Sequence, residues 1–167
     1  MLVAFRRLTE ADLDLVEKWL GREHVARSWR DDVDDSLAEY RAAIEGREPT
    51  DHFLIEVDGR QAGMVETYLV SDYPEWEKIV QVGAGVAGVD LLIGEAELIG
   101  RGLGPRILAA FARDVVFANP EIHAVVAAVE EPNRRSWRAF EKAGFRHVRD
   151  VEEDGLPHRL MRLDRAA

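Results

Sequence analysis

The first candidate for chemistry is the segment Gly100-Arg101-Gly102-Leu103-Gly104-Pro105-Arg106, which directly precedes a long apolar helical stripe. Small residues at a helix N-terminus let backbone N–H groups close around an anion, and the helix dipole also favours negative charge there. Two arginines add fixed positive charge. The segment lacks the Gly-Lys-Ser/Thr end of a P-loop, and Pro105 breaks a GxGxxG pattern. The pattern favours a pyrophosphate, and a glycine-rich turn without a ligand is the alternative.

A second glycine motif, Val82-Gly83-Ala84-Gly85-Val86-Ala87-Gly88, satisfies GxGxxG and follows an apolar run. A dinucleotide-binding unit needs a helix after the last glycine and an acidic residue about 20 residues further on. Here that stretch holds the other glycine-rich segment and a long helical stripe instead. The order of elements therefore argues against a dinucleotide site at this motif.

Charge is unevenly distributed along the 167 residues, which carry a net charge of -10. Residues 98–149 are the basic part, with nine basic and five acidic side chains, and residues 1–97 are strongly acidic. A basic segment that begins at a glycine loop suits a phosphate-bearing ligand, while the acidic remainder attracts cations and repels polyanions. We therefore expect the acidic part to attract cations, and we expect no nucleic-acid partner.

The composition excludes several other kinds of site. The chain has no cysteine, which rules out disulfides, thiolate metal sites and cysteine nucleophiles. Its five histidines show no metal-binding spacing, so no metal is expected. No apolar run approaches the ~18 residues of a membrane span, and the N-terminus carries no signal-peptide pattern. These observations predict a cytoplasmic protein without a membrane partner.

The elements that must position these residues follow from hydrophobic periodicity and turn signals. A strand is predicted at 2–8, and Thr9 with Asp12 predicts a capping box for a helix that ends near residue 20. Asp58-Gly59 and Asp154-Gly155 are typical of tight hairpin turns. The remaining predicted elements are a helix at 34–44, strands at 52–57 and 61–69, a loop at 70–79, an apolar strand region at 79–93, a helix at 103–117, a strand at 122–129, a helix at 133–142 and strands at 145–151 and 158–163.

Two blocks of the sequence resemble the GNAT superfamily of acetyl-CoA-dependent N-acyltransferases. The first is the family's R/Q-x-x-G-x-G/A motif, which Gly102 and Gly104 match, although Ile99 stands at the position of the Arg or Gln. The second is N-x-x-A-x-x-x-Y-E-K-x-G-F, which begins at Asn133 and has Phe140 at the position of the tyrosine. The predicted order of strands and helices also agrees, so the resemblance covers nearly the whole chain.

The resemblance implies one α/β (α+β) domain over residues 1–167, with a mixed, largely antiparallel sheet of about seven strands flanked by four helices. It also implies acetyl-CoA as co-substrate, with the pyrophosphate at the start of the helix and Asn133 near the CoA arm. Backbone amides near residues 91–93 are expected to stabilise the oxyanion. The residues predicted to bind acetyl-CoA are Leu92, Ile93, Ile99, Gly100, Arg101, Gly102, Leu103, Gly104, Pro105, Arg106 and Asn133.

Within the superfamily the chain looks most like aminoglycoside 6'-N-acetyltransferases. The residues that carry this likeness are Glu17-Lys18-Trp19-Leu20, Gly85-Val86-Ala87-Gly88-Val89-Asp90 and the run from Gly100 to Gly104. The implied function is transfer of acetyl to a primary amine of a cationic small molecule, with the 6'-amine of an aminoglycoside as the leading acceptor. A siderophore-type lysine N-acyltransferase and a non-catalytic acyl-CoA-sensing domain are the alternatives. Both a monomer and a homodimer remain open.

Carboxylates are expected on the acceptor side, because a cationic amine must be held and must then lose a proton. In the enzymes that the chain resembles, the aspartate at the position of Asp90 faces the amine. An ordinary aspartate, with a pKa near ~3.9, is a poor base for an amine, so we assign Asp90 to holding the ammonium. Glu66, on a predicted strand, is the second candidate catalytic residue.

Aromatic and acidic residues in two loops are the other candidates for acceptor binding. Asp72, Tyr73 and Trp76 precede the glycine-rich strand and are predicted to clamp the acceptor, with aromatic faces against its sugar rings. Trp29 lies between the first two predicted helices, a segment that commonly overhangs the acceptor site in the superfamily. Since Phe140 removes the family's usual general acid, Tyr68 is the one tyrosine expected to replace it.

Overall fold

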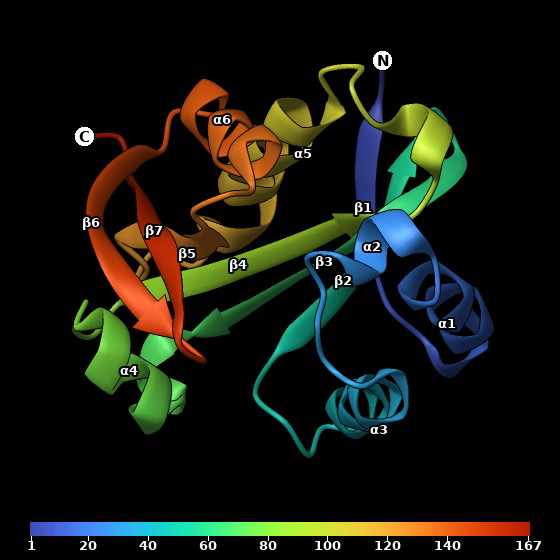
Figure 1. The fold of residues 1–167 in the computed structure, drawn as a ribbon, viewed down its shortest axis with the longest axis horizontal. Coiled ribbons are helices and arrows are strands. Elements are labelled where there is room, and N and C mark those ends of the chain that lie inside the picture. The colour runs from blue at the N-terminus through green and yellow to red at the C-terminus, as the bar shows by residue number, and fades with distance from the viewer. The chain divides into compact units, whose positions relative to one another are not determined.

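The structure is a computed structural model that describes residues 1–167 (Figure 1). Its strands are β1 Val3–Arg7, β2 Asp51–Val57, β3 Arg60–Leu69, β4 Val86–Ile93, β5 Ala124–Glu130, β6 Arg146–Glu153 and β7 Leu156–Asp164. Its α-helices are α1 Leu13–Leu20, α2 Glu23–Ala26, α3 Val33–Ile44, α4 Pro74–Val80, α5 Leu103–Phe111 and α6 Arg134–Lys142. Short 3-10 helices span Glu10–Asp12, Val70–Asp72 and Ala96–Leu98, and a π-helical turn, Ala112–Val116, continues α5.

The seven strands form one mixed sheet in the order β1-β2-β3-β4-β5-β7-β6. The pairs β1-β2, β2-β3, β5-β7 and β6-β7 are antiparallel, whereas β4 and β5 are parallel, with Val86–Gly88 opposite Ala124–Val126. The predicted α/β class and the largely antiparallel seven-stranded sheet are therefore confirmed. The number of helices was wrong, since six α-helices are present instead of four.

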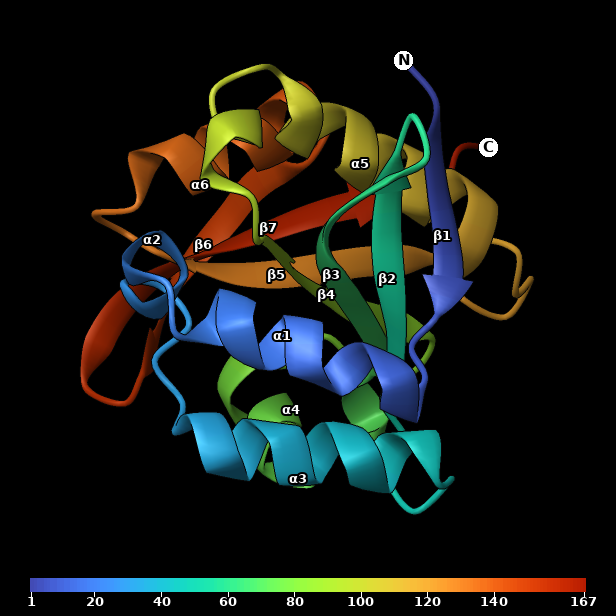
Figure 2. The ribbon, with the colours of Figure 1, turned by 90° about the vertical axis from the view of Figure 1, so that its right-hand side faces the viewer.

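Backbone contacts group the residues into two compact units, one of residues 1–67 and 90–101 and the other of residues 68–89 and 102–167. The first unit packs its core around Trp19, which is completely buried, together with Leu54, Met64 and Leu92. Figure 2 shows α1 and α3 running side by side in this unit. This unit carries β1, β2 and parts of β3 and β4. The prediction of one domain over 1–167 stays a prediction.

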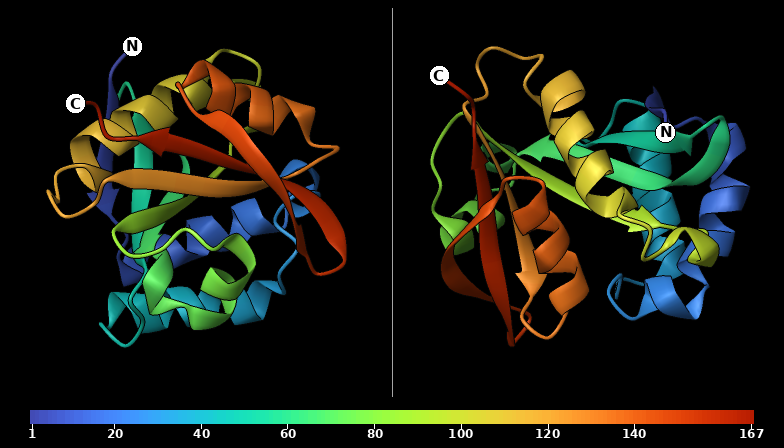
Figure 3. Two further views of the ribbon diagram at one scale, coloured as in Figure 1. Left: turned by 90° about the vertical axis from the view of Figure 1, so that its left-hand side faces the viewer. Right: turned by 90° about the horizontal axis from the view of Figure 1, so that it is seen from above.

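The second unit has its own core, built on Val86, Val126 and Leu160 with Val70 and Val80 from the segment before β4. Its helices α5 and α6 lie next to each other (Figure 3). Apolar residues on α5, Leu103, Ile107 and Phe111 among them, are buried, as the helical stripe predicts. The start of α5 is therefore anchored by packing.

Local signals at the turns were read correctly. Asp58 and Gly59, and likewise Asp154 and Gly155, have φ between 50° and 78°, which a tight hairpin turn needs. Asp12 accepts a hydrogen bond from the backbone N–H of Thr9 at 2.8 Å, so the predicted capping box is present. Both hairpins, β2-β3 and β6-β7, therefore have the predicted turns.

The prediction of a loop at 70–79 is wrong, because this segment holds a 3-10 helix and α4. Pro74 occupies the first turn of α4, where its missing N–H costs nothing. The helix ends at Gln81, which adopts a left-handed φ of 49°, and β4 begins only at Val86. The short helix α2 was also missed. None of the helices combines the length and apolar character that crossing a membrane requires.

Candidate active site

The glycine-rich segment forms the loop that leads into α5. Gly102 is the N-cap of α5 with φ 72°, and Gly100 has φ 79°, both in the region that favours glycine. A Cβ at either position would meet no atom within 4 Å. No side chain caps this helix and no acidic residue stands in its first turn. An exposed, uncapped helix start of this kind fits a pyrophosphate.

The residues around the glycines of the predicted acetyl-CoA site differ in their exposure to solvent. Arg101 and Arg106 are exposed, whereas Leu103 is buried and anchors the helix. Pro105 has no N–H to offer, so the backbone donors of the first turn come from the residues around it. Ile99 ends the 3-10 helix Ala96–Leu98 and is half-buried.

Asn133 is the N-cap of α6. Its side-chain oxygen accepts a hydrogen bond from Ser136 N at 3.3 Å, so capping fixes where the side chain lies. A Cβ at Gly104 would lie 3.3 Å from the Cβ of Ala139, which makes Gly104 the point of close approach between α5 and α6. The role of Asn133 toward CoA stays a prediction.

Phe140 lies in the core. It is 5% exposed, and its ring meets the edge of Phe145 with 5.0 Å between the centroids. Tyr68, the suggested replacement, packs against β4: a Cβ at Gly88 would be 2.6 Å from its hydroxyl. Only glycine at position 88 therefore leaves room for this tyrosine.

Glu66 and Asp90 share one face of the sheet. Side chains alternate along a strand, so Asp90 lies on the face of Leu92, and Glu66 on the face of Met64. Leu92 and Met64 belong to the same buried cluster. Both carboxylates are half-buried. The two predicted catalytic residues are thus brought to a common face, at the rim of an apolar core.

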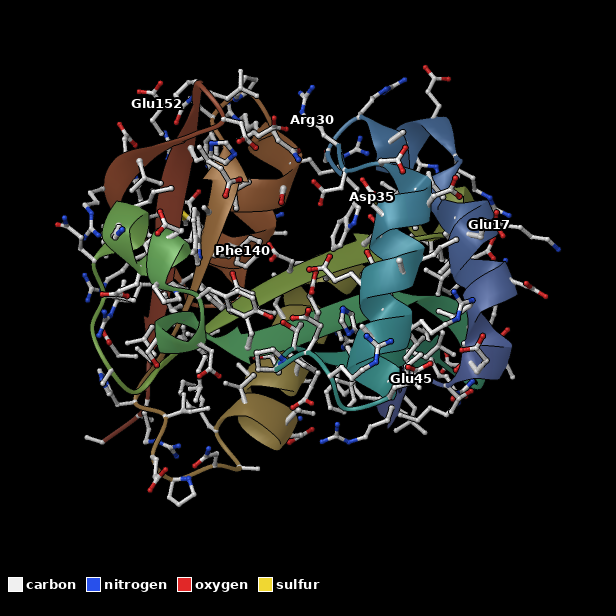
Figure 4. All side chains as sticks on the ribbon, turned by 90° about the horizontal axis from the view of Figure 1, so that it is seen from below. Glu17, Arg30, Asp35, Glu45, Phe140 and Glu152 are labelled. Atoms are coloured by element: carbon white, nitrogen blue, oxygen red, sulfur yellow. The ribbon has the colours of Figure 1, made fainter.

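Helix α3 covers this face. Tyr40 on α3 is 2% exposed and packs in the same cluster, with its ring centroid 4.6 Å from that of His52 on β2. Trp29 Nε1 donates a hydrogen bond to the Tyr40 hydroxyl at 3.0 Å, which brings the predicted Trp29 to the same part of the unit. Figure 4 marks Asp35 near the start of α3 and Glu45 just past its end. Burial, followed by the charge of Glu66, raises the pKa of Tyr40, so its hydroxyl stays protonated.

His52 and Tyr40 were missed as candidate site residues. A lone histidine on a strand carries no spacing signal, and only the pairing of β2 with β3 brings it opposite Glu66. The signal that was present is polarity: His52 directly precedes the apolar run Phe53-Leu54-Ile55 of its strand.

The end of β4, where Leu92 and Ile93 were predicted to bind acetyl-CoA, is held by the first two helices. His24 Nε2 lies 3.0 Å from the Ile93 carbonyl oxygen, and Arg22 donates to the carbonyl of Gly94 at 2.8 Å. Arg22 also pairs with Glu95 at 2.8 Å, and this contact is the main cause that lowers the pKa of Glu95. The strand end thus has a fixed position relative to α1 and α2.

The residues predicted to clamp the acceptor lie around α4. Asp72 is exposed, and Tyr73 meets Tyr68 edge-on with 5.3 Å between ring centroids. Trp76 packs against the core of the second unit, and its Nε1 is buried without a hydrogen-bond partner. Asp72 and Tyr73 are accessible to an acceptor, whereas most of the Trp76 indole serves packing.

Neither a dinucleotide site at the second glycine motif nor a metal site receives structural support. Gly88 of the second glycine motif lies inside β4, so no helix follows the motif and the dinucleotide interpretation fails. No group of three or more His, Cys, Asp or Glu side chains is arranged to hold a metal ion.

A family model described as "Acetyltransferase (GNAT) domain" matches residues 9–153. The chain belongs to this family. The matched range includes the uncapped start of α5, the carboxylate face and the cap of α6. The GNAT resemblance is thereby confirmed, and with it the prediction of an acyltransferase enzyme.

Two relatives and one solved structure are informative. The chain is 28% identical over 150 residues to an aminoglycoside N(6')-acetyltransferase type 1 of Klebsiella pneumoniae, covering 86% of this chain and 73% of that protein. It is 24% identical over 164 residues to a lysine N-acyltransferase of Mycolicibacterium paratuberculosis, covering 96% of this chain and 73% of that protein. The crystal structure of the aminoglycoside acetyltransferase AAC(6')-Ib with coenzyme A and kanamycin matches with a TM-score of 0.88 at 28% identity, covering 98% and 95% of the chains.

Proposed function

We propose that this protein transfers acetyl from acetyl-CoA to a primary amine of a cationic small molecule, and that the acceptor is the 6'-amine of an aminoglycoside. The observation that carries the proposal is the likeness to aminoglycoside 6'-N-acetyltransferases, in sequence over 86% of this chain and in fold over 98% of it. The acidic face with Glu66 and Asp90 supports it, because an aminoglycoside is a polycation.

The loop before α5 is the proposed site for the pyrophosphate of acetyl-CoA. Its fit rests on the positive φ of Gly100 and Gly102, the open space around them and the uncapped amides of α5. Arg101 and Arg106 would add charge to the same anion. When bound, acetyl-CoA supplies the acetyl group as a thioester with a good leaving group.

On the acceptor side the chain must hold an ammonium and then remove its proton, since only a neutral amine attacks a carbonyl carbon. We assign Asp90 and Glu66 to these tasks, with Trp29, Asp72, Tyr73 and Trp76 as neighbouring contacts. Backbone N–H groups near residues 91–93 are assigned to the developing oxyanion, where preorganised donors contribute most. The hydrogen bond from Arg22 to the Gly94 carbonyl, just past β4, helps to hold this end of the strand in place.

Lysine acylation is the second candidate function. It is favoured by the match to a lysine N-acyltransferase over 96% of this chain. A free lysine side chain carries one ammonium, whereas an aminoglycoside carries several.

Thiol release from acetyl-CoA, read with a disulfide reagent, tests both candidates. The protein contributes no background, because it has no cysteine. The panel pairs kanamycin with a matched aminoglycoside that bears a hydroxyl at 6', and adds lysine and N-hydroxylysine. Release with kanamycin but with no other compound of the panel supports the proposal, together with mass and NMR spectra of a 6'-acetylated product. Release only with the lysine compounds supports the second function, and CoA binding without any release contradicts both.

A further inference from the structure

His52 is a buried histidine to which the proposed function gives no task. Its side chain is 2% exposed, and neither ring nitrogen has a hydrogen-bond partner. A buried polar group without a partner costs about 1–3 kcal/mol, and nearly all such groups in folded proteins are satisfied. A histidine without such a partner, on the sheet face that carries Glu66 and Asp90, therefore calls for a functional explanation.

Glu66 is the polar neighbour of His52. The two residues are opposite each other in the β2-β3 pairing, and His52 Nε2 lies 3.2 Å from Glu66 Oε2. The atoms are at hydrogen-bond distance but are not aligned for one. The Tyr40 ring covers the imidazole from α3 at a tilt of 56°. A small rotation of the imidazole would therefore turn the contact into a hydrogen bond without exposing the ring to water.

We propose that His52 is a positioning residue of the acceptor site, which takes up through Glu66 the proton that the acceptor ammonium loses. This inference rests on the proposed function. The N–H bond of the ammonium breaks, its electron pair stays on the amine nitrogen, and the proton passes to a carboxylate oxygen of Glu66. Glu66 passes it to Nε2 of His52. The result is a neutral amine, an ionised Glu66 and an imidazolium beside it.

The chemistry of the pair suits this step better than a carboxylate alone. Free glutamic acid titrates near ~4.3 and imidazole near ~6.5, so the histidine is the better proton acceptor at neutral pH. Glu66 is 16% exposed at its side chain and can reach an acceptor, whereas His52 cannot. The carboxylate makes the contact and the imidazole holds the proton.

Acidic and neutral groups surround His52 and would attract a proton held there. The titratable groups that face His52 are Glu66 on β3 and Tyr40 and Glu39 on α3, and Asp90 lies on the same sheet face. None of them is a cation. Desolvation, followed by repulsion from Glu66, raises the pKa of Glu39.

The test compares His52→Gln, Glu66→Gln and the double variant by kcat with the best amine acceptor from pH 5 to pH 9. His158→Gln is the matched control, because His158 is also a buried strand histidine, but its Nδ1 has a partner, the Leu156 carbonyl at 2.9 Å. Acetyl-CoA affinity and thermal unfolding are measured for every variant. These two readouts detect a merely structural defect.

We expect each single variant to lower kcat at least about tenfold, and the double variant to lose no more than either single one, because the residues act as a unit. The fall in wild-type kcat on the acid side of the pH profile should disappear in His52→Gln. Wild-type kcat in His52→Gln, additive losses, or a loss that His158→Gln shares would overturn the inference. A wild-type protein that acetylates no amine overturns the proposed function itself, and the inference with it.

Discussion

Gly102 offers the sharpest test of the donor side. Gly102→Val adds a branched side chain at φ 72°, a conformation that costs a residue with a Cβ about 1–2 kcal/mol. The new Cβ meets no atom within 4 Å, so no collision adds to this cost. The same side chain stands where the backbone must approach the phosphate. Loss of one hydrogen bond to a charged group, worth about 1.5–3 kcal/mol, predicts roughly 10- to 100-fold weaker CoA binding.

A matched control separates strain from blocked access. Gly46, just past α3, has φ 78° and equally open surroundings, so Gly46→Val should lower the free energy of unfolding by a similar amount. Calorimetric titration with CoA should then show wild-type affinity for Gly46→Val and weakened affinity for Gly102→Val. Wild-type affinity in Gly102→Val, or equal weakening in both variants, would refute the assignment of this loop to the pyrophosphate.

Three further outcomes are expected. Asp90→Asn should lower kcat at least about tenfold in the thiol-release assay while leaving acetyl-CoA affinity unchanged, and unchanged turnover would remove Asp90 from the reaction. Tyr68→Phe should also lower kcat about tenfold if its hydroxyl protonates the departing thiolate; equal rates would leave water as the donor. Hydrogen bonding from Arg6 is the main cause that lowers the pKa of Asp12 below its ordinary 3.8, so the stability that this pair contributes is present above about pH 4 and is lost as pH falls through the lowered pKa. Asp12→Asn should therefore flatten the acid side of a plot of unfolding free energy against pH, and curves of the same shape for both proteins would contradict this.

The parts of the fold that were predicted correctly depend on short-range signals. Glycines and aspartates at 58–59 and 154–155 specify turns by their backbone freedom alone, and the stripe on α5 specifies a buried face by its spacing. The glycine loop was found in the same way, because an anion site at a helix start is made of consecutive residues. No knowledge of distant contacts is needed for any of these.

The segment around α4 was mispredicted because its signals conflict. Pro74 and several charges indicate a loop, yet the helix begins at Pro74 and buries Val80 in the second core. Tertiary packing therefore overrides local preference. The same packing explains why Trp76, predicted as a contact for the acceptor, has its Nε1 buried.

The pairing of His52 with Glu66 could not be predicted from the hairpin turn. Near the turn, Val57 pairs with Arg60 and Glu56 with Gln61, and a regular hairpin that continued this register would bring Val65 opposite His52. A β-bulge at Ile55 and Glu56 shifts the register by one residue. A shift of one residue exchanges the two faces of a strand.

Ala62 is the residue that the bulge leaves without a cross-strand partner on β2. Its carbonyl accepts hydrogen bonds from the backbone N–H groups of Gly94 and Glu95, at 2.8 and 3.4 Å. The irregularity is thus fixed by the end of β4, the same strand end that Arg22 holds. One local distortion therefore brings Glu66 opposite His52, and the contacts that fix it come from residues about 30 positions away. The proposed acceptor face depends on tertiary structure, whereas the loop proposed to bind the pyrophosphate is encoded in seven consecutive residues.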